Sequence, residues 1–174
     1  MTRLATFIAA FAAACIAACS PTLDWREFVP EGTDISVAFP CRPDRHARAV
    51  TVAGARVQME MLTCSAGDAT FALAFVDVAD PVRVSATLAD LRAAAVMNLQ
   101  GVAKQSAPLQ IKGMTSNEQA AQITVVGKLS DGVSVHAHMG FFARGLRVYQ
   151  ATVIGAGPTP RTVETFIDGL RFVG

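Results

Sequence analysis

Alternation of polar and apolar side chains is the feature that most restricts how this chain can fold. In the stretch Arg-Val-Gln-Met-Glu-Met at 56–61, the polar side chains of an extended chain point to one side and the apolar ones to the other. That pattern is typical of an antiparallel strand with one solvated face. Similar segments predict strands over 35–39, 48–53, 56–64, 70–78, 109–114, 120–129, 133–143 and 146–154. Turn residues between them predict hairpins at Ala53-Gly54, Ser130-Asp131-Gly132 and Arg144-Gly145.

Two other segments have the spacing of a helix. The first is rich in alanine, lacks Gly and Pro, and repeats apolar residues at Val84, Leu88, Leu91, Ala95 and Leu99. It predicts a helix near 86–100, with Ser85 as its N-cap and Gly101 beyond its end. The second predicted helix covers 160–172 and places Pro160 at its first position. The expected fold class is therefore α+β, an antiparallel β-sheet flanked by helices.

The length of the chain fits one folded domain. We expect residues 35–174 to form that domain, and residues 19–34 to form a tether followed by a segment that packs onto it through Trp25 and Phe28. Residues 1–18 hold one of the 15 basic and none of the 14 acidic residues, which leaves 14 charges of each sign in the rest of the chain. This balance argues against a nucleic-acid binder and against a polybasic membrane-surface module.

The N-terminal segment has the layout of an export signal. A short basic start, Met-Thr-Arg, is followed by an apolar run from Leu4 to Ala18 in which Thr6 is the only polar residue. The run is shorter than the roughly 20 residues that a helix needs to cross a bilayer. We therefore expect residues 1–18 to be a signal peptide rather than a retained membrane span.

The end of this run, Ile16-Ala17-Ala18-Cys19, resembles the lipobox of bacterial lipoproteins. The resemblance implies cleavage before Cys19, a diacylglycerol on its sulfur and a fatty acyl group, such as palmitate, on its amine. Two or more acyl chains give stable membrane anchoring. Ser20 stands where inner-membrane lipoproteins commonly carry aspartate, which implies the outer membrane, on the side that faces the periplasm. Cleavage by the ordinary signal peptidase, which would leave Cys19 as an incidental thiol, is the alternative.

Two cysteines remain for the folded part of the chain, Cys41 and Cys64. Cys15 lies in the signal segment, and Cys19 is the candidate lipid acceptor. In an oxidising compartment the remaining even pair predicts one disulfide. Two free thiols, or a redox or metal-binding pair, are the alternatives, but the Cys-x-x-Cys spacing typical of redox sites is absent from the sequence.

Two short motifs and the order of the predicted elements carry a resemblance to a known fold. The first strand ends in Phe39-Pro40-Cys41-Arg42-Pro43, and the last helix ends in Phe166-Ile167-Asp168-Gly169-Leu170-Arg171-Phe172. With a mid-chain helix and antiparallel strands between these motifs, the chain is similar to small bacterial envelope lipoproteins of uncharacterised function with a PsbP-like fold. The resemblance implies an α/β/α sandwich and no particular activity.

His136 and His138 are the candidate metal ligands. A spacing of two places both imidazoles on one face of the predicted strand, close enough to share a metal ion. No third ligand is evident, and two histidines on a solvated strand face are the alternative. His46 lies in the basic stretch 42–48, which we interpret as an exposed loop that contacts anionic lipid or a partner, or as a solvated turn.

The sequence has no pattern typical of a catalytic site. Asp131, Ser134 and His136 are close together, but Ser134 and His136 point the same way along one strand and no Gly-x-Ser-x-Gly elbow is present. Glycine-rich phosphate loops are also absent, so no cofactor is expected. The leading hypothesis is a non-catalytic, membrane-anchored envelope lipoprotein that binds an unknown envelope protein or supports its assembly. A carrier for a small apolar ligand or a metal ion is second, and a hydrolase is third.

Overall fold

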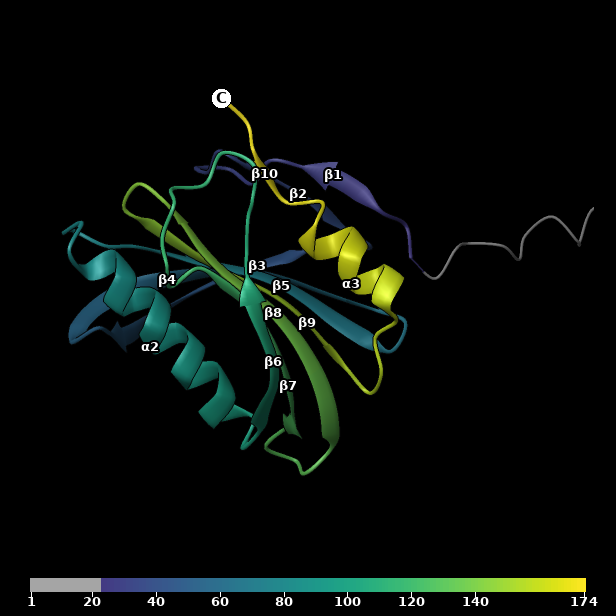
Figure 1. Cartoon of the computed structure of the whole chain (residues 1–174). Helices are drawn as coiled ribbons and strands as arrows, with labels where there is room; N and C mark the ends of the chain where they lie inside the picture. Colours follow the sequence, from purple (N-terminus) through teal and green to yellow (C-terminus); the bar gives the residue numbers. More distant parts are fainter. Residues whose placement is uncertain (1–22) are drawn as a thin grey trace, which may run out of the picture.

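Ten strands and two helices make up the part of the chain that the structure describes (Figure 1). The structure is a computed structural model and describes residues 23–174, so the expected signal peptide, the lipobox and Cys19 lie outside the described residues. In chain order the elements are β1 (Arg26–Phe28), β2 (Ile35–Phe39), β3 (Asp44–Val52), β4 (Ala55–Ala66), β5 (Ala69–Asp77), α2 (Arg83–Asn98), β6 (Val102–Pro108), β7 (Ala121–Lys128), β8 (Ser134–Arg144), β9 (Arg147–Gly155), α3 (Pro160–Ile167) and β10 (Arg171–Phe172).

The strands form two antiparallel sheets. Seven of them pair side by side in the order β3-β4-β5-β9-β8-β7-β6, and three short ones pair as β1-β2-β10. The β3–β4 turn has positive φ at both central residues, 47° at Ala53 and 71° at Gly54, as a type I′ hairpin turn requires. The prediction of a fold dominated by antiparallel strands is therefore confirmed.

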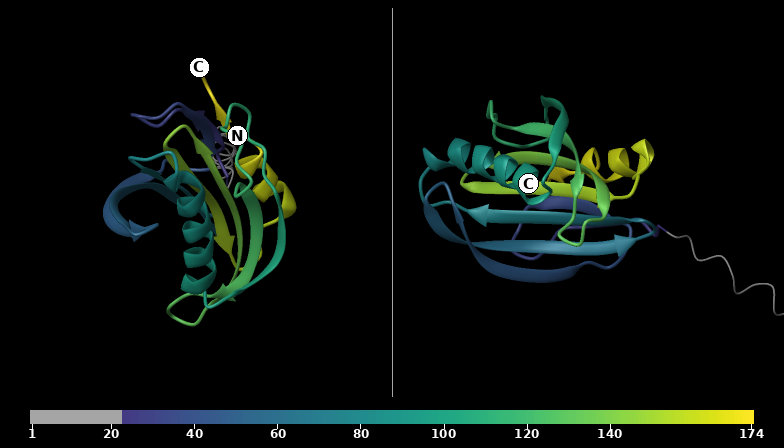
Figure 2. Two further views of the ribbon diagram at one scale, coloured as in Figure 1. Left: turned by 60° about the vertical axis from the view of Figure 1, so that its left-hand side comes forward. Right: turned by 90° about the horizontal axis from the view of Figure 1, so that it is seen from below.

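Alternate residues of the central strands pack into two separate cores. On β8, Val135, Ala137 and Met139 share one core with the buried residues of α2. Phe142, on the opposite side of the same strand, shares the other core with the buried residues of α3. One helix therefore packs against each face of the seven-stranded sheet. Figure 2 shows this sheet curving around α2, with the β3–β4 hairpin on one side of the helix.

The prediction of a strand over 109–114 is wrong, because the strand in this region is β6. All seven residues of β6 are exposed at the edge of the sheet, so they carry no apolar alternation that would identify the strand. Leu109 and Ile111 are buried, but they reach the core from an irregular segment. The i, i+2 spacing of Leu109 and Ile111 is typical of a strand, but these residues are buried without forming one.

Both helices differ from their predicted bounds, α2 at both ends and α3 at its end only. α2 begins at Arg83, so Ser85 lies inside the helix instead of capping it. α3 begins at Pro160, as predicted, but it ends at Ile167. A short turn follows, and residues 171–172, which were expected to be helical, pair with β2 as β10. The backbone of these two residues pairs with β2, and the backbone N of Phe172 donates to the carbonyl O of Lys112 at 2.9 Å, so no further helical turn is needed.

The segment before β2 packs onto the domain as expected. Trp25 packs edge-on against Phe71, which belongs to the core that α3 covers, with ring centroids 5.5 Å apart. Phe28 lies against Phe39, with ring centroids 5.7 Å apart. Between them β1 pairs with β2, so backbone hydrogen bonds as well as aromatic contacts hold this segment.

A disulfide joins Cys41, just after β2, to Cys64 in β4, as the sequence predicts. The Sγ atoms are 1.98 Å apart and the Cα atoms 5.9 Å apart. In the chain-entropy model a loop of this length contributes about 3 kcal/mol to the free energy of unfolding. The bond links the three-stranded sheet to the seven-stranded sheet.

Within residues 23–174, no helix has the length and apolar character needed to cross a membrane.

Candidate ligand groove

A groove lies between α2 and the part of the concave sheet face that this helix leaves uncovered. We call it the methionine groove, because Met59 and Met61 of β4 and Met97 of α2 line it. Its volume is about 470 Å³, which lies within the range of small-molecule sites in proteins. Its walls are a helix and a paired sheet, so its shape is fixed by regular elements.

Strand pairing places the floor of the groove in rows across the sheet. Met61 lies opposite Ala74 of β5, which in turn lies opposite Gln150 of β9. In the next row, Ala72 of β5 lies opposite Thr152 of β9. Both β5 positions are alanine, so their side chains are too short to fill the space beneath the helix.

Small side chains on α2 also leave this space open. Ala93 and Ala94 line the groove, and Met97 at its rim is 69% exposed. At one end, Asp90 Oδ2 accepts a hydrogen bond from the backbone N of Ala53 at 2.8 Å, which joins the helix to the β3–β4 turn. In the described part of the chain, no hydrogen bond or ion pair joins the C-terminal half of α2 to β3. A hydrogen bond therefore joins α2 to the β3–β4 turn at one end of the groove, and the helix and β3 are not joined at the other end.

A few polar side chains interrupt the apolar surface. Gln150 Nε2 donates a hydrogen bond to Thr152 Oγ1 at 3.2 Å, so these two side chains lie together on the floor. Arg48 stands on β3 opposite Met59, and its side chain is exposed. Sparse polar groups in an apolar site typically fix the orientation of a ligand. Besides Gln150, Thr152 and Arg48, the polar residues of the lining are Thr51, Asp90 and Asn98.

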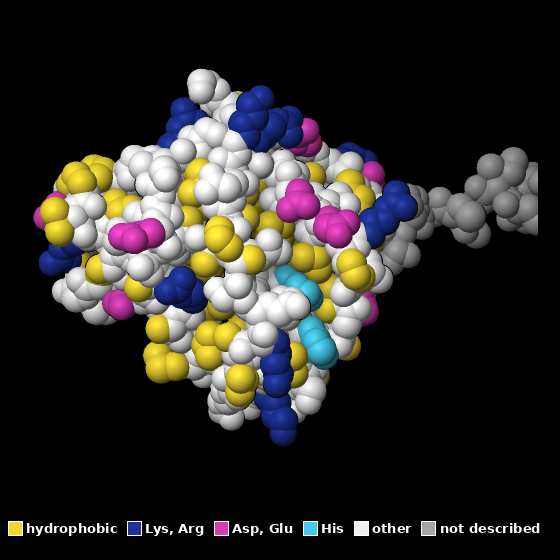
Figure 3. Space-filling view, viewed as in Figure 1, with side chains coloured by type: hydrophobic (Ala, Val, Ile, Leu, Met, Phe, Trp, Pro, Cys, Tyr) yellow, Lys and Arg dark blue, Asp and Glu magenta, His cyan; other side chains and the backbone are white. Residues whose placement is uncertain are grey.

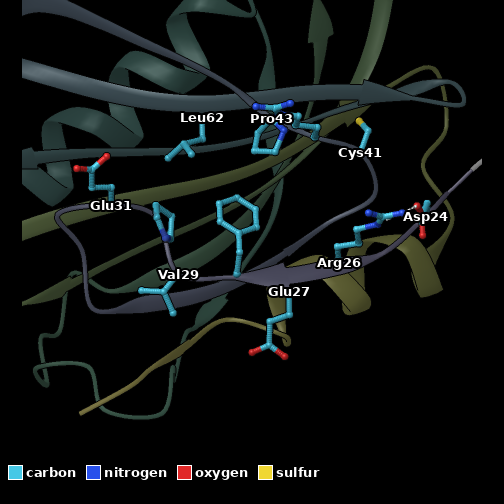
Figure 4. Close-up of a pocket in the computed structure, with 11 residues that line it drawn as sticks. Asp24, Arg26, Glu27, Val29, Glu31, Cys41, Pro43 and Leu62 are labelled. Carbon is cyan, nitrogen blue, oxygen red and sulfur yellow. Dashed lines mark hydrogen bonds and ion pairs between the residues drawn. The ribbon is translucent and has the colours of Figure 1, made fainter.

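A second groove, of about 710 Å³, lies between β1 and the β3–β4 hairpin (Figure 4). We call it the N-terminal groove. Leu62 and Pro43 line its inner side, and Figure 4 shows Glu27 pointing away from it. At its rim Arg26 Nη2 lies 2.6 Å from Asp24 Oδ2, so these two charges already satisfy each other. One wall is the three-residue strand β1, so a shorter regular element fixes the shape of this groove than fixes that of the methionine groove.

His136 and His138 lie on the same side of β8, as expected. Because Val135 and Ala137 point into the α2 core, the two imidazoles point to the opposite side, away from the methionine groove. His138 Nδ1 lies 3.3 Å from Thr124 Oγ1, and burial, followed by the neighbouring His136, lowers the pKa of His138. Figure 3 shows two histidine side chains next to each other on the surface. From residue 23 onward, no group of three His, Cys, Asp or Glu side chains is arranged to hold a metal ion, and metal binding by the pair stays a prediction.

The basic stretch 42–48 is not the loop or turn that the sequence suggested. Most of it belongs to β3, an edge strand that pairs with β4 along its whole length and includes His46. Arg48 points to the concave side of the sheet, into the methionine groove. Arg45 points to the other side, where its Nε donates a hydrogen bond to Glu60 Oε2 at 2.7 Å. Exposure on both faces removed the alternation that would have marked the strand.

Sequence reasoning missed a network of charged and aromatic residues at one end of the sheet. Arg147 holds Asp77 through two hydrogen bonds, of 2.6 and 2.7 Å, and its Nη1 donates to the carbonyl of Gly32 at 2.5 Å. Beside it, Tyr149 is fully buried, and its hydroxyl lies 3.5 Å from Asp34 Oδ1. Burial is the main reason that the pKa of Tyr149 is raised to about 12. The network clamps the loop before β2 onto β5 and β9, which is a structural role.

Comparison with known proteins shows no family for this chain. No family model matches it, and no curated protein does. One solved structure with a limited likeness is that of PA94 from Pseudomonas aeruginosa, a protein of unknown function. The two share 15% sequence identity with a TM-score of 0.38, over 68% of this chain and 86% of that one. A likeness of this size supports no conclusion about function.

The burial of Tyr149 can be tested directly, because it is the only tyrosine in the chain. We expect ultraviolet absorbance to follow its ionisation with a midpoint at about pH 12 in the native protein and about pH 10 in the unfolded protein. The folded pKa lies above the unfolded one, so this contribution to stability is complete below about pH 10 and is lost as the pH rises toward the folded value. A native midpoint near the unfolded one would contradict the burial of the phenol.

Proposed function

We propose that the protein is a lipid-anchored, non-catalytic binding module of the bacterial envelope, and that its ligand lies in the methionine groove. The observation that carries this proposal is the groove itself, an apolar site between a helix and a curved sheet with only a few polar groups. A small, largely apolar ligand fits such a site better than a folded protein partner does. The groove therefore favours the carrier hypothesis over contact through the polar sheet face.

We propose that the fold is the PsbP-like α/β/α sandwich that the sequence resembles. The packing of α2 and α3 on opposite faces of one antiparallel sheet supports this assignment. A fold of this kind carries no function with it, so no role is transferred from other proteins that have it.

The proposed anchor, Cys19, would keep the groove near a membrane. Four residues lie between Cys19 and Asp24, so the two positions are at most about 18 Å apart at full extension. A domain held this close to the outer membrane would meet apolar molecules that enter or leave the bilayer. The disulfide between Cys41 and Cys64 supports the periplasmic location, because such bonds persist in oxidising compartments.

A second candidate function is docking of an envelope protein at the N-terminal groove. Asp24 lines that groove, so the site would lie at the end of the domain next to the proposed anchor. A partner bound there would be held between the domain and the membrane.

Substitutions on α2 test the proposed site. Ala94→Phe places an aromatic ring in the methionine groove, and we expect it to reduce the binding of the neutral fluorescent probe N-phenylnaphthylamine at least tenfold. Ala86→Phe puts the same ring on an exposed position of the same helix that does not line the groove, so binding should stay as in the original chain. Equal binding by both variants, or no binding by the original protein, would contradict the proposal.

The anchor is tested by expressing the full-length chain in a Gram-negative bacterium and measuring the intact mass of the protein extracted from membranes. We expect a mature chain that begins at Cys19 and carries acyl chains. Cys19→Ala should remove the acyl mass and release the protein from the membrane fraction. An unmodified, freely soluble product from the original sequence would rule out lipidation and leave a diffusing periplasmic binder.

A further inference from the structure

Arg48 is a cation at the methionine groove that has no partner among the residues that the structure describes. It stands on the edge strand β3, its side chain is exposed, and no acceptor or acidic group within residues 23–174 is hydrogen-bonded to it or ion-paired with it. Arg48 is the arginine of the groove lining, whereas Arg45 on the same strand is paired with Glu60 and points to the other side of the sheet. A guanidinium presents a planar fork of donors that matches a carboxylate. Arg48 is therefore free to bind an anionic group at the rim of the groove.

The second charged residue of the lining is Asp90, and it favours one orientation of such a ligand. Its carboxylate contacts Ala53, directly after the end of β3. Arg48 lies four residues before Val52, or about 13 Å along the strand. An anionic head group is repelled at the Asp90 end and attracted beside Arg48. The remainder of the ligand would extend away from Asp90, toward the end where the helix and β3 are not joined.

The surface along that path suits a flexible apolar chain. Met61 and Met97 line its two sides, and Ala72 and Ala94 leave room between them. Methionine side chains are unbranched and polarizable, so they adapt to a chain that has no fixed shape. A chain lying in the groove would also cover Met97, which is otherwise 69% exposed.

We propose that the ligand of the methionine groove is a single-chain amphiphile with an anionic head, a fatty carboxylate. Its carboxylate pairs with Arg48 at the rim, and its hydrocarbon chain lies between β4 and α2. This inference rests on the proposed function and adds the chemical class of the ligand to it. The proposal concerns binding alone and includes no covalent step.

Displacement of N-phenylnaphthylamine by decanoate and by decanol separates the head group from the chain. Both ligands have the same hydrocarbon length, and only one carries a charge. An exposed ion pair changes an affinity by about two- to fivefold, so we expect decanoate to displace the probe that much more effectively than decanol. Decyltrimethylammonium, with a cationic head, should be the weakest of the three.

Arg48→Gln should abolish the preference for decanoate and leave decanol unchanged. Arg45→Gln is the matched control, because it removes the same charge from the same strand but on the opposite side of the sheet, so the preference should survive. Circular dichroism would establish that both variants fold.

The outcomes distinguish the two proposals. Equal displacement by decanoate and decanol in the original protein, or a preference that persists in Arg48→Gln, overturns the assignment of an anionic ligand and leaves an apolar groove. Failure of both decanol and decanoate to displace the probe overturns the proposed function together with this inference.

Discussion

The apolar stripe of α2, formed by Val84, Leu88, Leu91 and Ala95, is buried against the concave face of the seven-stranded sheet. The sheet curves around this helix, and the helix packs mainly over β8 and β9. A single helix cannot cover seven strands, so β3 and β4 extend beyond it, and Met59 and Met61 of β4 are turned toward the same face. The groove is thus a consequence of how one helix and one wide sheet fit together.

Much of this fold could be predicted from the sequence, because β7 alternates in burial and because β5, β8 and β9, which contribute to both cores, are long apolar segments. The pairing of Cys41 with Cys64 also followed from their even number and from the export that the N-terminal segment predicts. The edge strands β3 and β6 were harder to predict from the sequence. β6 has no buried residue, and the first part of β3 is exposed on both sides, so neither showed the alternation on which the prediction relied.

The site itself could not be predicted, since it depends on residues that are distant in sequence and ordinary in type. Ala72 and Ala94 matter because they are small where the helix crosses the sheet, and no local pattern marks them. Arg48 looked like one of several charges in a basic stretch until strand pairing placed it opposite Met59. The clamp between Asp77 and Arg147 joins residues 70 positions apart, so it too required the strand register.

Nuclear magnetic resonance of methionine methyl groups would show whether a ligand occupies the methionine groove. With methyl-labelled methionine and a saturating amount of decanol, we expect the signals of Met59, Met61 and Met97 to shift. The signal of Met114, which packs against the other core, should stay in place. Shifts confined to Met114, or no shift at any methionine of the groove while the ligand binds, would show that the ligand lies elsewhere and would contradict the account.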